Sequence, residues 1–164
     1  MDTQNALQVA ESILQLIASR LARPATDRLD ATIAAAQLPA TVQALQRARF
    51  GYLSAVTGLD HPASAAKAGD APPPAGRVEV LYHFCEGAAV VTLRVIVPYD
   101  AARVPSICHL IPSATLYERE LGEMFGVTVE GTPVADHLLL PDAWPEGVYP
   151  LRKSFAGKVA GTGS

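Results

Sequence analysis

Residues 113–155 read SATLYERELGEMFGVTVEGTPVADHLLLPDAWPEGVYPLRKSF, and this stretch decides how the chain is interpreted. Its first part predicts a helix that opens near Thr115, because Glu118 three residues later completes a capping-box pattern. The helix is expected to end at Gly126, since glycine readily adopts the left-handed conformation of a helix C-cap. Four apolar side chains fall on one stripe of this helix: Tyr117, Leu121, Met124 and Phe125.

Charged residues crowd the predicted helix. Glu118, Arg119 and Glu120 are consecutive and cannot all point the same way, so at least one carboxylate is expected close to apolar neighbours. Arg119 and Glu123 are spaced as an i,i+4 pair on the far face, where Leu116 also falls. The helix is therefore a site of interest to which these residues alone assign no chemistry.

The segment after the helix is apolar but interrupted by proline. Residues 133–150 contain four prolines, too many for a continuous helix or a central strand. A disordered tail would be poor in large apolar side chains. We therefore expect residues 127–164 to form an extended strap that docks on a surface, after a platform formed by residues 1–126 of the same domain. The large apolar residues of the strap are Leu138, Leu139, Leu140, Trp144, Val148, Tyr149, Leu151 and Phe155.

Five short motifs in this stretch carry a family resemblance. They are 118–120 (ERE), 123–126 (EMFG), 130–133 (EGTP), 139–144 (LLPDAW) and 150–153 (PLRK). In this order they resemble the signature of the thirty-kilodalton (C) subunit of respiratory complex I, the NADH:quinone oxidoreductase, also called NADH dehydrogenase (ubiquinone). The same module occurs in membrane-bound, energy-converting NiFe hydrogenases. The motifs cover about a quarter of the chain, which makes the resemblance specific.

The sequence also departs from the family pattern. Thr132 stands where the family usually has His, Leu116 where it has Trp, and Ser154 where it has Asp. The extra residue in 144–147 (WPEG) is more similar to the hydrogenase branch. The resemblance therefore leaves open whether the chain serves complex I or a hydrogenase.

The resemblance implies a non-catalytic structural subunit of the peripheral arm of a complex I-like oxidoreductase, supporting electron transport. It would dock on the large subunit of the forty-nine-kilodalton type (the D-type large subunit), or on the hydrogenase large subunit, beside other peripheral-arm subunits. No cofactor is expected in this chain; iron–sulfur clusters and, in the hydrogenase branch, a nickel–iron centre are expected in partner subunits. The expected location is peripheral, on the cytoplasmic side of the inner or plasma membrane.

Fifteen residues are expected to mediate docking through protein–protein interaction. Arg152 is expected to face the partner, because a guanidinium can form bidentate pairs with carboxylates. Trp144 fits a buried interface anchor, although it could equally cover the sheet of its own domain. The expected docking residues are Leu116, Glu118, Arg119, Glu120, Glu123, Phe125, Gly126, Gly131, Pro133, Pro141, Trp144, Pro150, Leu151, Arg152 and Lys153.

The rest of the 164-residue chain predicts a single α+β domain, with a mostly antiparallel sheet and helices packed on one face. Hydrophobic periodicity predicts helices over residues 5–21 (ended by Pro24), 38–48 and, as a short helix, 104–110. Strands are predicted over residues 29–36, 50–59, 78–84 and 88–97, with a hairpin at Glu86-Gly87 and a loop over 61–76.

Composition and motifs exclude several classes of function. A net charge of −3 gives no electrostatic reason to bind nucleic acid or an anionic membrane. No apolar run approaches the roughly 18 residues of a spanning helix, and the N-terminus does not resemble a signal peptide, so membrane association is expected only through the complex. Cys85 and Cys108 form no CxxC pair, and Asp136-His137 supplies too few ligands for a metal.

Two alternatives to a structural subunit stay open. One is a small acid/base enzyme that uses the carboxylates of Glu118, Glu120 and Glu123, which predicts a concave pocket beside the helix. The other is an independent adaptor for an unrelated protein.

Overall fold

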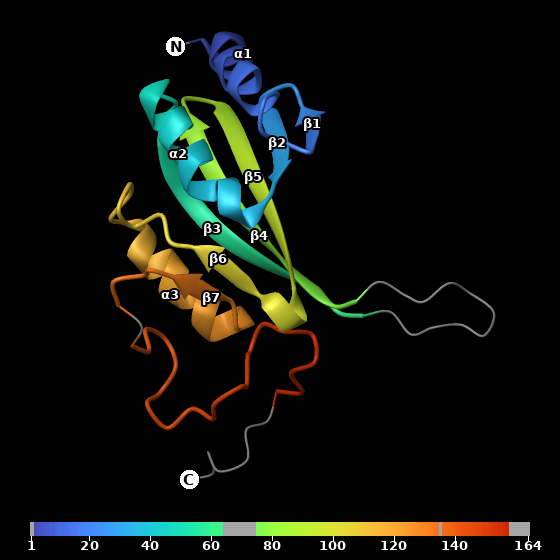
Figure 1. Ribbon diagram of the computed structural model, residues 1–164, viewed down its shortest axis with the longest axis vertical. Coiled ribbons are helices and arrows are strands. Elements are labelled where there is room, and N and C mark those ends of the chain that lie inside the picture. Colours follow the sequence, from blue (N-terminus) through green and yellow to red (C-terminus); the bar gives the residue numbers. More distant parts are fainter. Residues whose placement is uncertain (1, 64–74, 135, 158–164) are drawn as a thin grey trace, which may run out of the picture.

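The computed structural model describes residues 2–63, 75–134 and 136–157, which fold around a five-stranded sheet (Figure 1). The strand order is β1 (Arg20–Ala25), β2 (Arg28–Ile33), β5 (Ala89–Pro98), β4 (Arg77–Glu86) and β3 (Tyr52–His61). Within this sheet, as the described residues form it, β2 and β5 are the one parallel pair and the other pairs are antiparallel. A second, two-stranded parallel sheet joins β6 (Arg103–Pro105) to β7 (Thr128–Glu130).

Three helices cover one face of the large sheet: α1 (Thr3–Leu14), α2 (Leu38–Arg47) and α3 (Ala114–Phe125). Alternate residues of β4, such as Val80 and Tyr82, are buried in the same cluster as apolar side chains of all three helices. The opposite face carries charge, where Arg94 pairs with Asp30 at 2.8 Å and with Glu79 at 2.6 Å. The predicted α+β fold, with a mostly antiparallel sheet, is confirmed.

The first helix is shorter than predicted, since α1 ends at Leu14 and β1 follows it. Apolar periodicity does not mark this end, because Leu21 joins the core from a strand. Pro24 lies in β1 where its register with β2 shifts, between Ala22 and Ala25. An edge strand tolerates proline at such an irregularity, because no ladder N–H is needed there. The prediction that Pro24 ends a helix was wrong.

The predicted short helix at 104–110 was also wrong, because Val104 belongs to β6 and pairs with Val129 of β7. Long-range strand pairing therefore overrides the local pattern. The other predicted elements are present, with shifted ends. They are the helix over 38–48 and the strands over 29–36, 50–59, 78–84 and 88–97. Gly87 occupies the hairpin turn with a φ of 57°. Most of the predicted loop 61–76 lies outside the described residues, and His61 belongs to β3.

The signature helix α3 covers Ala114–Phe125. Its C-cap residue is Gly126, whose φ of 64° confirms the predicted left-handed cap. The predicted capping box was wrong: Ser113 is the N-cap residue and makes no side-chain hydrogen bond. The hydroxyl of Thr115 donates to the carbonyl of Pro112 at 2.9 Å, and the Glu118 side chain turns into the domain instead. After β7 the described chain continues without helix or strand, as expected for a strap, while the division at residue 126 stays a prediction.

Gly58 on β3 lies against the ring of Phe125, where α3 packs on the sheet. A Cβ placed there would lie 2.5 Å from ring atoms of Phe125. Gly58→Ala is therefore expected to lower the free energy of unfolding by about 1–3 kcal/mol, the usual cost of overpacking. Denaturant unfolding measures this change. The matched control is Gly122→Ala in α3, where the added Cβ meets only Val127 O at 3.4 Å and stability should hold or rise. Equal stability of the two variants would contradict the packing.

Candidate partner-docking surface

Glu118 is a buried carboxylate, 2 % exposed, in the middle of α3. Its oxygens accept hydrogen bonds from the Ser106 hydroxyl at 2.8 Å, the Ile107 N–H at 2.7 Å and the Cys108 thiol at 2.9 Å. Burial, together with this carboxylate, raises the pKa of the Cys108 thiol. This arrangement ties the turn after β6 to α3 and confirms the expectation that one carboxylate of the ERE motif lies among apolar neighbours.

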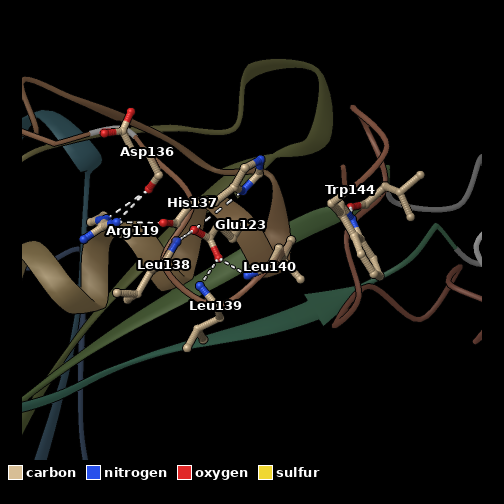
Figure 2. Close-up of polar contacts among 9 residues, drawn as sticks. Arg119, Glu123, Asp136, His137, Leu138, Leu139, Leu140 and Trp144 are labelled. Carbon is tan, nitrogen blue, oxygen red and sulfur yellow. Dashed lines mark hydrogen bonds and ion pairs between the residues drawn. The ribbon is translucent and has the colours of Figure 1, made fainter. Parts of the chain in front are cut away.

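Arg119 and Glu123 hold residues 136–140 of the strap against α3 (Figure 2). Arg119 donates to the backbone carbonyls of Asp136 and His137 at 3.0 and 2.9 Å. Glu123 accepts from three successive backbone N–H groups, those of Leu138, Leu139 (2.9 Å) and Leu140 (3.1 Å). Within the described chain the two residues make these bonds rather than the predicted i,i+4 ion pair, because the strap places backbone groups above each of them.

These contacts make the anchoring of the strap sensitive to pH. Burial of Glu123 opposes its charge, but the three strap N–H groups outweigh this effect and hold its pKa below the ordinary value. A carboxylate whose pKa is lower in the folded state stabilises the fold above its unfolded-state pKa. That contribution is lost as the pH falls through the folded-state pKa. Carboxyl NMR titration should report this depressed pKa, and the loss should coincide with exchange broadening of the Leu139 and Leu140 amides.

The control is Glu123→Gln, in which the amide signals of residues 138–140 should be broadened already at neutral pH and change little on acidification. A Glu123 carboxyl that titrates at its ordinary value would contradict the arrangement.

The end of the strap is fixed at the C-terminus of α3 by Arg152. Its Nε donates to the carbonyl of Phe125 at 2.7 Å, where a cation also complements the helix dipole. The guanidinium carbon lies 4.2 Å from the ring centroid of Tyr99 and 5.3 Å from that of Tyr149. Arg152 therefore contacts its own domain through hydrogen-bonding and cation–π interactions.

Backbone groups on either side of Arg152 complete this attachment. The N–H of Leu151 donates to Met124 O at 3.1 Å, and the N–H of Lys153 donates to the Asp60 carboxylate at 2.8 Å. Asp60 is buried on β3 and also accepts a hydrogen bond from the Tyr99 hydroxyl. The strap is thus attached at two places, by residues 136–140 and by residues 151–153.

Between these two attachments the strap arches over a cleft of about 390 Å³ lined by α3, β7 and residues 144–149. Trp144 lines this cleft and is half-buried. Its indole N–H donates to Val148 O at 2.8 Å, and its ring centroid lies 6.1 Å from that of Phe155. These contacts are all within the strap, and Trp144 is outside the buried core cluster.

The expected docking residues differ in exposure and in the contacts they make within this chain, and their contact with a partner stays a prediction. Glu118 and Phe125 are buried, and Arg119, Glu123 and Arg152 bind backbone groups of this chain. Gly126 caps α3, and a Cβ there would strike the ring of Tyr149. Trp144 and Pro150 are half-buried, and the exposed members are Leu116, Glu120, Gly131, Pro133, Pro141, Leu151 and Lys153.

Asp60, Tyr99 and Ser106 anchor the strap and the helix but were not predicted from sequence. They lie outside the signature stretch, and no local spacing links them to it. The three carboxylates proposed for acid/base chemistry do not converge, since Glu118 and Glu123 line the cleft whereas Glu120 borders a different hollow.

The described residues contain no group of three His, Cys, Asp or Glu side chains that could hold a metal ion. Nor do the helices in these residues have the length and hydropathy of a membrane span.

Comparison with known proteins agrees with the fold and the motifs. The family described as "Respiratory-chain NADH dehydrogenase, 30 Kd subunit" matches residues 31–160. The C subunit of the NADH-quinone oxidoreductase of Chloroherpeton thalassium is 34% identical over 113 residues, which are 67% of this chain and 41% of that protein. The C/D subunit of the Salmonella typhimurium enzyme is 38% identical over 88 residues, which are 52% of this chain and 14% of that protein.

Two solved structures share the fold. A chain of the membrane-bound sulfane sulfur reductase (MBS), described as an archaeal respiratory membrane complex, matches with a TM-score of 0.73 and 24% identity. That match covers 92% of this chain and 85% of the other. A trypsin-resistant fragment of Nqo5 matches with a TM-score of 0.61 and 22% identity, covering 82% of this chain and 99% of the fragment.

The fold is thus that of an α+β domain shared with chains of these two solved structures. The chain belongs to the family of the 30 Kd subunit of respiratory-chain NADH dehydrogenase, as its five motifs predicted. It spans less than half the length of the curated relatives named above.

Proposed function

We propose that this chain is a structural subunit of the peripheral arm of a complex I-like oxidoreductase and docks on the D-type large subunit through α3 and its strap. Family membership supports the assembly. The Salmonella relatives carry the designations C and D on one chain, which supports proximity to a subunit of type D. The proposal applies equally to the NADH:quinone oxidoreductase and hydrogenase branches.

The observation that carries the proposal is a set of exposed leucines on a helix and a strap that are held in a fixed arrangement. Leu116, Leu139 and Leu151 are 56, 58 and 52 % exposed, on a helix and a strap that lie side by side. Six described bonds from the side chains of Arg119 and Glu123 to the strap backbone fix the strap near Leu139. A surface ordered before binding loses less conformational entropy when a partner covers it.

Under this proposal the partner subunits carry out the redox chemistry. Iron–sulfur clusters and, in the hydrogenase branch, a nickel–iron centre would be held by the subunits on which this chain docks. The complex would place the chain on the cytoplasmic side of the membrane without contacting lipid itself. Its contribution to electron transfer would be to brace the large subunit that carries the redox centres.

Co-purification tests the proposal. The tagged chain, produced in its native host, should bring down a large subunit of the D type or the hydrogenase type in a stoichiometric complex. Leu116→Asp with Leu151→Asp should abolish this complex, because charges would enter an apolar interface. The matched control is Leu59→Asp, a leucine 40 % exposed on β3 with its side chain on the opposite sheet face, which should leave the complex intact. Recovery of the chain without any large redox subunit would refute the proposal.

A further inference from the structure

The cleft under the strap is a second feature of this surface, separate from the exposed leucines. Its apolar wall includes Val129, Leu140 and Trp144, and its polar lining includes Glu118 and Glu123. The strap is attached to the domain on either side of the cleft, by residues 136–140 and by residues 151–153.

The charges that line the cleft are unbalanced. Glu118 turns its carboxylate inward to the turn after β6, and the cleft is further lined by two carboxylates, those of Glu123 and Glu146, and one guanidinium, that of Arg119. Among the described residues neither Glu118 nor Glu123 forms an ion pair with Lys or Arg; the only ionic neighbour is His137, 3.7 Å from Glu123. The three strap N–H groups stabilise the charge of Glu123 but, among the described residues, leave it without a Lys or Arg partner, so a cation from outside the domain would complement it.

One wall of the cleft is a strand edge. Thr128 N–H donates to Ala102 O, and Glu130 O accepts from Ser106 N–H, both at 2.8 Å, so these two residues direct their peptide groups toward β6. Because successive residues of a strand direct their peptide groups to opposite sides, the N–H and C=O of Val129 point away from β6. An extended segment can add to such an edge through main-chain hydrogen bonds.

A neighbouring side chain also lacks a partner. The hydroxyl of Thr132 lines the cleft, is shielded from solvent and has no hydrogen-bond partner among the described residues. A polar atom in this position is suited to an incoming polar or backbone group.

We propose that the cleft receives an extended segment of the large partner subunit, with a Lys or Arg side chain directed at Glu123 and Glu146 and backbone groups beside Val129. This inference rests on the proposed function and specifies how the partner engages the strap. The segment threads beneath the arch, so the partner contacts both surfaces of the strap and not its outer face alone.

Site-specific photocrosslinking tests the proposal on the full chain bound to its co-expressed large subunit. A benzophenone amino acid replaces Val134, which lines the cleft and is 38 % exposed, or Leu59, which has matched exposure on the far sheet face. The expected result is crosslinking from position 134 to a Lys- or Arg-containing segment of the large subunit, and none from position 59.

Each other outcome overturns the inference. If the complex forms but position 134 crosslinks only to residues 158–164 of this chain, only to a segment without Lys or Arg, or to nothing, the cleft inference fails and the proposed function stands. If the unmodified chain forms no complex with the large subunit, both fail.

A charge substitution gives an independent measurement. Thr132→Arg places a cation in the cleft from the chain itself, while Thr132→Gln is a shorter polar control without charge. The Arg variant should bind the large subunit at least about tenfold more weakly than the Gln variant, because it repels the incoming cation and occupies its position. Equal affinities of the two variants would overturn the electrostatic part of the inference. Thermal unfolding of both variants verifies that they are folded.

Discussion

Replacing Glu118 by Ala is expected to lower the free energy of unfolding by about 3 kcal/mol, because three buried donors lose their acceptor at once. These donors are the Ser106 hydroxyl, the Ile107 N–H and the Cys108 thiol, all in the turn that follows β6. The substitution also leaves a cavity beneath α3. Denaturant unfolding followed by circular dichroism measures the loss.

Glu118→Gln is the matched control for shape. Its amide oxygen can still accept from Ile107 and its amide nitrogen can donate to the Ser106 hydroxyl, but the Cys108 thiol loses its acceptor, so an intermediate loss is expected. A second control, Glu120→Ala, removes an exposed carboxylate from the same helix and should change stability by less than about 0.5 kcal/mol. If Glu118→Ala were as mild as Glu120→Ala, Glu118 could not be the anchor that the structure indicates.

Replacing Arg152 by Ala is expected to weaken binding of the large subunit by about 30-fold or more, equivalent to about 2 kcal/mol. The substitution removes the hydrogen bond to Phe125 O and the stacking on Tyr99, so the end of the strap loses its position before the partner arrives. The fall in affinity comes from lost pre-organisation, because the partner must then order the strap itself. Binding is measured with purified components at fixed ionic strength.

Arg152→Lys distinguishes position from charge. Lysine keeps the positive charge but has no planar guanidinium to stack on the tyrosine and reach the carbonyl together, so it should recover only part of the affinity. The sheet and α1–α2 core should stay folded in both variants. Affinity unchanged in Arg152→Ala would show that the strap does not need this attachment.

The sequence predicts those elements whose signals are local. Helix α3 follows from its apolar stripe, and its end follows from Gly126, which must adopt a positive φ. The hairpin between β4 and β5 follows from Gly87. Strand β6 could not be predicted, because three residues become a strand only when β7, more than twenty residues later, lies beside them.

The same distinction applies to the docking surface. The proline-interrupted apolar composition indicates an extended strap, and three adjacent charges require a buried carboxylate. No sequence pattern indicates that Glu123 would bind three strap N–H groups, since a backbone donor looks the same at every position. Nor can spacing link Asp60 on β3 with the backbone of Lys153, because the fold alone brings them together.

Hydrogen–deuterium exchange of the chain, alone and bound to its large subunit, tests the docking claim most directly. The account predicts slower exchange on binding in residues 128–130 and 133–155, with no change in α1 and α2. Protection confined to the helices α1 and α2 or to the open face of the sheet, with the strap exchanging as fast as in the free chain, would contradict it.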